Sequence, residues 1–185
     1  MTAPALSLPR KLLYAGVVSL VAVVLLLVGL EAGLRLVHYG YSRHFARRVT
    51  LPDGEKVWRE NRWATAPYFS PALVRRPQSF RLPAGKAPGT YRIFVLGSSA
   101  AMGDPEPSFS IARVLETLLR ASYPDVRFEV VNAGITAINS HLTRLIAEDC
   151  AALEPDLFIV YERHNDDIGP FGLSGVFTPS FRNDT

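Results

Sequence analysis

The feature that most constrains this chain is a long apolar run near its N-terminus. The run extends from Leu12 to Leu30 (LLYAGVVSLVAVVLLLVGL) and contains no charged residue. As a helix it is about 28 Å long, close to the ~30 Å hydrocarbon core of a bilayer. It exceeds the roughly 7–15 apolar residues of a signal peptide, and no small-x-small cleavage site follows it. The sequence therefore predicts a tail over residues 1–11 and an uncleaved transmembrane helix over residues 12–30, which contacts membrane lipid.

Basic residues flank this run on both sides, and more of them follow it than precede it. The positive-inside rule accordingly favours a cytoplasmic position for the C-terminal flank. The same residues contribute to the net charge of +3. Because no aromatic residues alternate with them on a sheet or helix, they indicate a charged face beside anionic lipid and not a nucleic-acid interface. They are Arg10 and Lys11 before the run, and Arg35, Arg43, Arg47 and Arg48 after it.

Residues 31–89 separate the apolar run from the part of the chain with regular patterns. Residues 31–50 are interpreted as a helical continuation, with Glu31 and Arg35 spaced to pair at i,i+4. From residue 51 onward, prolines interrupt every periodicity, so this juxtamembrane approach segment is predicted to be extended or irregular. Aromatic residues, Trp58 and Trp63 among them, are interspersed with the prolines. Their presence indicates that the segment packs on a folded domain.

Residues 90–185 alternate strand-like and helix-like patterns. Ile93–Leu96 is a short continuous apolar run, which is typical of a parallel strand buried on both faces. The order strand, helix, strand, helix, strand predicts an α/β domain, a three-layer sandwich with a parallel sheet. The other expected elements are a helix over 111–119 behind a Ser108 or Ser110 cap, a strand over 128–131, a helix over 142–153 and a strand over 157–161.

Each predicted strand ends in a polar or glycine-containing turn. The turns are 97–99 (Gly-Ser-Ser), 132–134 (Asn-Ala-Gly) and 164–166 (His-Asn-Asp). In an open α/β sheet, ligands bind at the edge where the carboxyl ends of the strands meet. One turn supplies a hydroxyl, one a glycine amide and one a side-chain amide. This set fits a serine nucleophile with an oxyanion hole.

These residues resemble the sequence blocks of the SGNH (GDSL) hydrolases. In VLGSSAAMG, Ser99 matches the nucleophile, Ser98 stands in the aspartate place and Gly103 is the later glycine. Gly134 in VVNAGITAINS matches the glycine of the second block, and Asn165 in YERHNDDIGPFG matches the asparagine of the third. The resemblance covers residues 90–172 and implies an SGNH/flavodoxin-like fold. It also implies that Ser99 N–H, Gly134 N–H and the Asn165 side chain form the oxyanion hole.

Two departures from the family pattern affect the expected activity. Arg163 stands where the third block has a glycine. The Asp-x-x-His block that supplies the family's base does not occur up to Thr185. General-base activation of a serine contributes about 10²–10⁴-fold to the rate. The chain is therefore interpreted as the N-terminal part of a longer, incomplete SGNH domain or as a degenerate copy, and its catalytic activity is left open.

The anchor and the approach segment resemble those of membrane-anchored bacterial members. The resemblance implies a serine esterase, lipase or acyl/acetyl-transfer domain on the extracytoplasmic side of the bacterial inner membrane, opposite to the side that the positive-inside rule favours. Its substrate would be an ester-bearing small molecule, lipid or acylated glycan. No cofactor, metal or nucleic-acid partner is expected. The alternative is a non-catalytic membrane-tethered binding module, and nucleotide binding at the same edge is a weaker third reading.

Simpler interpretations exist for the individual residues. Ser99 could cap the helix that follows it, Gly134 could be a turn glycine, and Asn165 could close an Asx-turn. His141 is the remaining candidate for a substitute base, because it falls in the first turn of the second helix. Cys150 lies in an apolar helical stripe and is interpreted as a buried hydrophobic residue.

Overall fold

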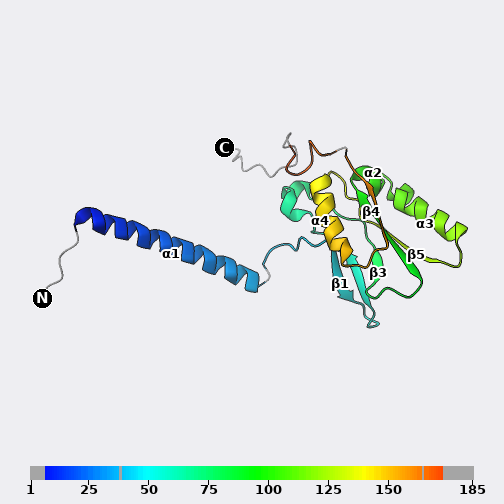
Figure 1. Ribbon diagram of the computed structural model, residues 1–185, viewed down its shortest axis with the longest axis horizontal. Helices are drawn as coiled ribbons and strands as arrows, with labels where there is room; N and C mark the ends of the chain where they lie inside the picture. The colour runs from blue at the N-terminus through cyan, green and yellow to red at the C-terminus, as the bar shows by residue number, and fades with distance from the viewer. Residues whose placement is uncertain (1–6, 38, 164, 173–185) are drawn as a thin grey trace. The chain divides into compact units, whose positions relative to one another are not determined.

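The computed structural model describes residues 7–37, 39–163 and 165–172 (Figure 1). The chain divides into two compact units, residues 1–40 and 41–185. The first unit contains the helix α1 (Leu8–Leu36), which begins after an extended Ser7 with Pro9 in its first turn. No residue of α1 is buried, and its mean hydropathy reaches 2.7. It is thus long and apolar enough to span a membrane.

The predicted helical continuation through residue 50 is wrong beyond Leu36. Glu31 and Arg35 do pair across one helical turn, at 2.7 Å between Oε1 and Nε. The helix then ends, Gly40 has a positive φ of 114°, and β1 (Ala46–Thr50) is a strand. The basic residues of this strand pair with residues of a neighbouring strand, which lie further along the chain than the i,i+4 spacing of a helix. The local spacing therefore predicted a helix where the chain forms a strand.

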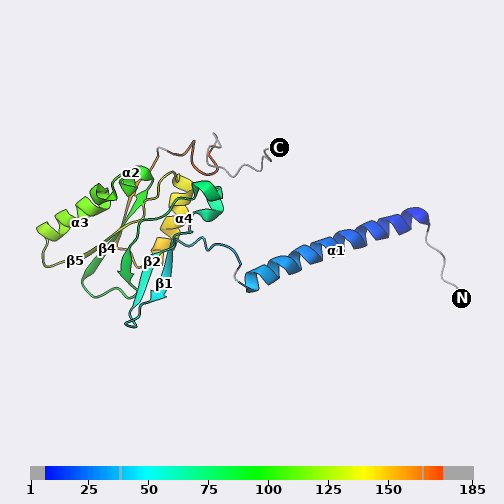
Figure 2. The ribbon, with the colours of Figure 1, turned by 180° about the vertical axis from the view of Figure 1, so that it is seen from behind.

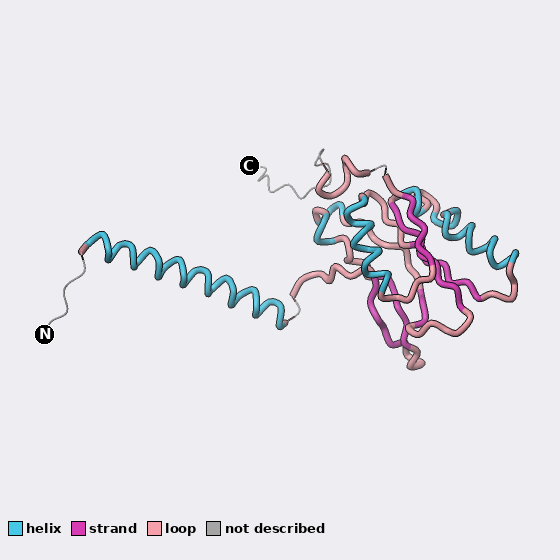
Figure 3. The backbone as a smooth tube through the Cα atoms, in the orientation of Figure 1, coloured by secondary structure: helices cyan, strands magenta, loops and turns pink. Residues whose placement is uncertain are grey.

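The second unit contains an antiparallel sheet in the order β1-β2-β3. Figure 3 shows the strands of the chain in magenta. The other strands of the antiparallel sheet are β2 (Lys56–Glu60) and β3 (Arg81–Pro83). The proline-rich segment is therefore extended, as predicted, but it supplies two regular strands that the sequence pattern did not indicate. Pro83 lies on the outer strand β3, where a missing N–H disturbs the sheet least. Two short 3₁₀ turns, Ala66–Tyr68 and Pro71–Leu73, lie between β2 and β3.

The predicted strand-helix-strand-helix-strand order is confirmed. A parallel sheet with the strand order β5-β4-β6 is formed by β4 (Thr90–Gly97), β5 (Arg127–Asn132) and β6 (Leu157–Tyr161). The connections contain the short helix α2 (Ser99–Met102), a 3₁₀ turn (Pro107–Phe109), and the helices α3 (Ile111–Ser122) and α4 (Ser140–Ala151). Ser110 caps α3 by accepting a hydrogen bond from Arg113 N–H at 3.3 Å. The second unit is thus a mixed α/β structure.

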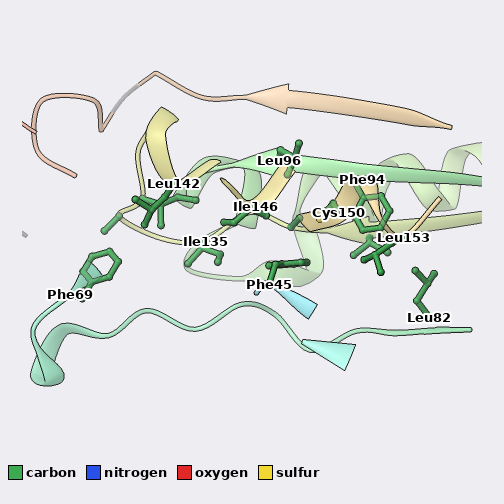
Figure 4. Close-up of a cluster of buried hydrophobic side chains, with 14 residues drawn as sticks. Phe45, Phe69, Leu82, Phe94, Leu96, Ile135, Leu142, Ile146, Cys150 and Leu153 are labelled. Atoms are coloured by element: carbon green, nitrogen blue, oxygen red, sulfur yellow. The ribbon is translucent and has the colours of Figure 1, made fainter. Parts of the chain in front are cut away.

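Both faces of the central strand β4 are covered. On one face, Phe94 and Leu96 pack against residues of α4, and Leu82 of the antiparallel sheet joins the same buried cluster (Figure 4). On the other face, Val95 packs with Ala101 and with Ala112 of α3. Figure 2 shows α3 and α4 on either side of the parallel strands. This arrangement leaves the carboxyl ends of β4, β5 and β6 at one sheet edge, where the predicted site residues lie.

Candidate active site

Gly97 ends β4, and steric contact explains the glycine. Its φ is 146°, and a Cβ built there would lie 2.0 Å from the Tyr161 carbonyl oxygen and 2.8 Å from Ala101 Cβ. No side chain fits in this space. The strand can therefore turn into α2 only because the residue is glycine, and the turn brings Ser98 and Ser99 to the sheet edge.

Ser99 is the first residue of α2 and is half-buried. Its carbonyl oxygen accepts hydrogen bonds from Gly103 N–H at 2.9 Å and Asp104 N–H at 3.0 Å. Ser98 occupies the N-cap position, and no side chain caps this helix. The capping interpretation of Ser99 is therefore wrong. Among the described residues, neither the Ser99 hydroxyl nor its N–H has a hydrogen-bond partner.

Gly134, in the loop after β5, lies directly against α2. A Cβ at this position would be 2.6 Å from Met102 N and 3.0 Å from the Ala101 carbonyl carbon. The next residue ties this loop to β4, because Ile135 N–H donates to the Gly97 carbonyl at 3.0 Å. The glycine at 134 is therefore required for the close approach of two site loops, not merely for a turn.

The N–H of Gly134 has an acceptor within the chain. It donates to Asn132 Oδ1 at 3.0 Å, and Asn132 Nδ2 in turn donates to the Met102 carbonyl at 3.0 Å. An oxyanion at this position would have to compete with the Asn132 oxygen for that N–H. The sequence placed Asn132 in the turn after the second strand, but it gave no sign that the Asn132 side chain binds Gly134 N–H.

Asn165 is buried, with 8% of its surface exposed. Its Nδ2 donates to the Ile138 carbonyl at 3.0 Å and so ties the loop after β6 to the loop after β5. Its own carbonyl accepts from Gly169 N–H at 2.7 Å. An asparagine amide has two N–H donors, and the bond to Ile138 occupies one of them. The side chain therefore joins the two loops.

Glu162 is a site neighbour that sequence reasoning missed. It directly follows β6 and accepts hydrogen bonds from Thr143 Oγ1 at 3.0 Å, Arg163 N–H at 3.2 Å and the Ser98 side chain. Burial raises its pKa above the ordinary value of 4.5, and these hydrogen bonds oppose the rise. Ser98, the neighbour of Ser99 in the chain, is only 1% exposed, and its side chain is held by the Glu162 carboxylate. The only signal in the sequence was a charged residue at a strand end.

Asp166, in the loop after β6, is hydrogen-bonded to the start of α4. Asp166 Oδ1 accepts Ser140 N–H at 2.9 Å, and this hydrogen bond is the main reason why the Asp166 pKa is lowered. The charges of His141 and Arg163 lower it further, so both lie near this carboxylate. His141 and Arg163 are exposed. His164 lies outside the described residues.

No cluster of metal-ligating side chains occurs within residues 7–37, 39–163 and 165–172. Asp149 instead accepts Phe45 N–H at 2.7 Å and lies 2.8 Å from His44 Nδ1, which joins α4 to the start of β1. Cys150 is fully buried in the main hydrophobic cluster. Burial and the neighbouring Asp149 charge raise its thiol pKa. The cysteine is therefore a core residue, as predicted, and not a nucleophile.

The chain matches no protein-family model, no curated protein and no solved structure. Any assignment of function consequently rests on the residues and the geometry described above. These define an α/β unit in which hydrogen bonds join the loops that follow β4, β5 and β6, in a chain whose N-terminal helix could span a membrane.

Proposed function

We propose that this chain is a membrane-anchored serine hydrolase domain of the SGNH type, in which Ser99 attacks an ester carbonyl. The observation that carries the proposal is the way the three loops are joined around α2. Ile135 bonds to Gly97, and Asn165 bonds to Ile138. Ser99 follows Gly97 by two residues, and its hydroxyl is unengaged among the described residues.

The proposed chemistry is acyl transfer. Ser99 Oγ forms a bond to the carbonyl carbon, and the carbonyl oxygen becomes an oxyanion that needs N–H donors. The ester C–O bond then breaks, the alcohol leaves with the proton that came from Ser99, and water hydrolyses the acyl-serine. Ser99 N–H and the second hydrogen of Asn165 Nδ2 are the donors with free capacity, whereas Gly134 N–H first has to leave Asn132 Oδ1. The proton of Ser99 has to pass to a base. No described residue hydrogen-bonds to that hydroxyl.

A fluorophosphonate probe tests the nucleophile directly, because it reacts with activated serines. The full chain in lipid nanodiscs should be labelled, and the labelled peptide should contain Ser99. Ser99→Ala should abolish labelling, whereas the adjacent control Ser98→Ala should retain it, since the Ser98 hydroxyl is committed to Glu162. Equal labelling of wild type and Ser99→Ala would remove the basis of the proposal.

The alternative is a non-catalytic binding module, and the engagement of Gly134 N–H by Asn132 favours it. Hydrolysis of a short-chain nitrophenyl ester separates the two functions. A hydrolase should show turnover that Ser99→Ala removes, and a binding module should show none. The substrates we propose are ester-bearing small molecules, lipids and acylated glycans of the cell envelope.

We further propose that α1 anchors the chain in the bacterial inner membrane with the second unit outside the cytoplasm. Asp53→Cys in the exposed hairpin between β1 and β2 provides a test. A membrane-impermeant maleimide should label this cysteine in spheroplasts without lysis. The native Cys150 is buried and should not contribute. Labelling only after lysis would place the second unit in the cytoplasm, as the positive-inside rule favours.

A further inference from the structure

Three arginines stand directly opposite one another across the antiparallel sheet. Arg47 of β1 pairs with Arg59 of β2, and Arg59 pairs with Arg81 of β3. Alternate residues of a strand face opposite sides. Ala46, Trp58 and Leu82, from the alternate positions, pack toward the buried cluster. The three arginines are all exposed, so they form a continuous row on the outer face of the sheet.

Acidic residues neutralise this row only in part. Arg81 pairs with Glu55. Arg59 Nε lies 3.9 Å from Glu60 Oε2, but the Glu60 carboxylate already accepts hydrogen bonds from Ser79 Oγ and Phe80 N–H. Arg47 forms no ion pair with any described residue. Like charges directly opposite each other in a sheet are destabilising, by roughly 0.2–1 kcal/mol per pair, and a bound anion would relieve that repulsion.

The position of the row in the chain indicates which anion is available. The helix α1 ends at Leu36 and β1 begins at Ala46. The intervening chain can span at most about 35 Å even when fully extended. If α1 crosses a membrane, the sheet is tethered within that distance of the lipid headgroups. Arg43 and Arg48 add positive charge in the same stretch.

We propose that the outer face of the sheet β1-β2-β3 binds anionic phospholipid headgroups through Arg47, Arg59 and Arg81. Guanidinium groups match phosphate oxygens with two parallel hydrogen bonds. A basic residue near an anionic membrane contributes about 1 kcal/mol, an attraction that falls off within a Debye length. Such binding fixes which side of the second unit faces the lipid. The inference rests on the proposed membrane anchorage and is independent of the role of Ser99.

Energy transfer from tryptophan to lipid tests this contact in the full chain. Both tryptophans, Trp58 and Trp63, lie in the second unit. The chain is placed in nanodiscs of phosphatidylcholine, or of phosphatidylcholine with phosphatidylglycerol, each with a dansyl-labelled headgroup lipid. Transfer should be greater with phosphatidylglycerol, and high salt should remove the difference. In the variant Arg47→Gln/Arg59→Gln/Arg81→Gln, the ratio of the two transfer efficiencies should fall well below the wild-type ratio, with Arg43 and Arg48 supplying what remains.

A matched variant separates the arginine row from net charge. Arg113→Gln/Arg120→Gln/Arg127→Gln removes the same charge from α3 and β5 and should keep the wild-type lipid response. Near-UV circular dichroism establishes that both variants are folded. The proposal is overturned if the row variant responds to phosphatidylglycerol like the wild type, or if both variants lose the response equally. It is also overturned if the wild type shows no lipid response, for example if the wild type binds a soluble acidic polysaccharide instead.

Discussion

Gly97 of β4 and Tyr161 of β6 pair in the parallel sheet so closely that a Cβ at position 97 would lie 2.0 Å from the Tyr161 carbonyl oxygen. The obstacle is backbone, which cannot rotate away as a flexible side chain can. The strand end that presents Ser98 and Ser99 is therefore held by contact between two backbones. Any side chain at position 97 has to push β4 and β6 apart.

Gly97→Ala should consequently destabilise the second unit by more than about 3 kcal/mol, the range that severe steric and backbone changes reach. Urea unfolding of the chain in mild detergent, followed by tryptophan fluorescence, measures the loss. Gly89→Ala is the matched control, because Gly89 also has a positive φ, 74°, but no atom within 4 Å of a built Cβ. It should cost only about 1 kcal/mol, from backbone strain alone. Similar losses for both variants would contradict the steric explanation.

Glu162 should make the second unit lose stability as the pH rises. Its pKa is raised in the folded state by burial, so the folded state holds the proton more tightly than the unfolded state. The stabilisation from this proton is complete below the ordinary pKa of 4.5 and is lost as the pH rises through the higher folded value. The stability of Glu162→Gln relative to wild type should therefore increase with pH above 4.5.

Glu106→Gln is a control of opposite sign. Hydrogen bonds from the Ser108 side chain and N–H lower the Glu106 pKa, so its contribution is present above 4.5 and lost as the pH falls through the lower folded value. Urea unfolding at a series of pH values gives both difference slopes. A Glu162→Gln difference that does not change with pH would contradict the predicted proton linkage.

The sequence indicated the parallel part of the fold because its signals are local. The apolar run at Ile93–Leu96, the helical spacing in α3 and the polar turns at the strand ends each involve neighbours along the chain. In the antiparallel sheet only the connection between β1 and β2 has a local signal, the Pro-Asp-Gly turn at residues 52–54. The strands β2 and β3 are separated by about 20 residues, and their pairing depends on burial of Trp58 and Leu82 against α4 and β4.

The residues of the candidate site also divide into those that have a local sequence signal and those that have none. Ser99, Gly134 and Asn165 could be proposed from turns at strand ends and from the family resemblance. Asn132 lies in one of these turns, but its contact with Met102 could not be predicted, nor could the role of Glu162, because the partners Thr143, Ser98 and Met102 come from other elements. The arginine row is also invisible in the sequence, since only the strand register aligns positions 47, 59 and 81.

Arg92 should be a strong determinant of stability, although it is a charged residue in a buried strand. It is 0% exposed, and its Nε lies 2.8 Å from Glu129 Oε2. The guanidinium also donates to the Leu153 carbonyl and, at 3.4 Å, to the Pro83 carbonyl. Arg92→Met would remove the buried donor from all three acceptors, at a cost of about 3–5 kcal/mol in urea unfolding.

The control for Arg92→Met is Arg127→Met, which removes a cation from the same glutamate. Arg127 Nη2 lies 3.7 Å from Glu129 Oε1, and its side chain is mostly exposed. Its loss should cost less than about 1 kcal/mol, as is usual for surface ion pairs. Comparable losses for the two variants would mean that burial of Arg92 contributes nothing beyond its charge.

The reaction rate of the Cys150 thiol should report how readily the hydrophobic core opens. Its thiol is 0% exposed, and burial raises its pKa, so the reactive thiolate is both scarce and inaccessible. Ellman's reagent at pH 8 should react with the folded chain far more slowly than with the chain in urea. A native rate equal to the unfolded rate would contradict the burial of Cys150.

The route of this reaction can be tested with one buried and one exposed substitution. Phe94 belongs to the same cluster as Cys150 and is fully buried, so Phe94→Ala should cost about 3–5 kcal/mol. If the reagent reacts with an opened state, that cost raises the labelling rate by roughly 10²–10³-fold, since 1.4 kcal/mol is a factor of ten. Val114→Ala on the outer side of α3, where Val114 is 48% exposed, should leave the rate nearly unchanged. Equal acceleration by both substitutions would mean that the thiol is reached without opening of the cluster around Phe94.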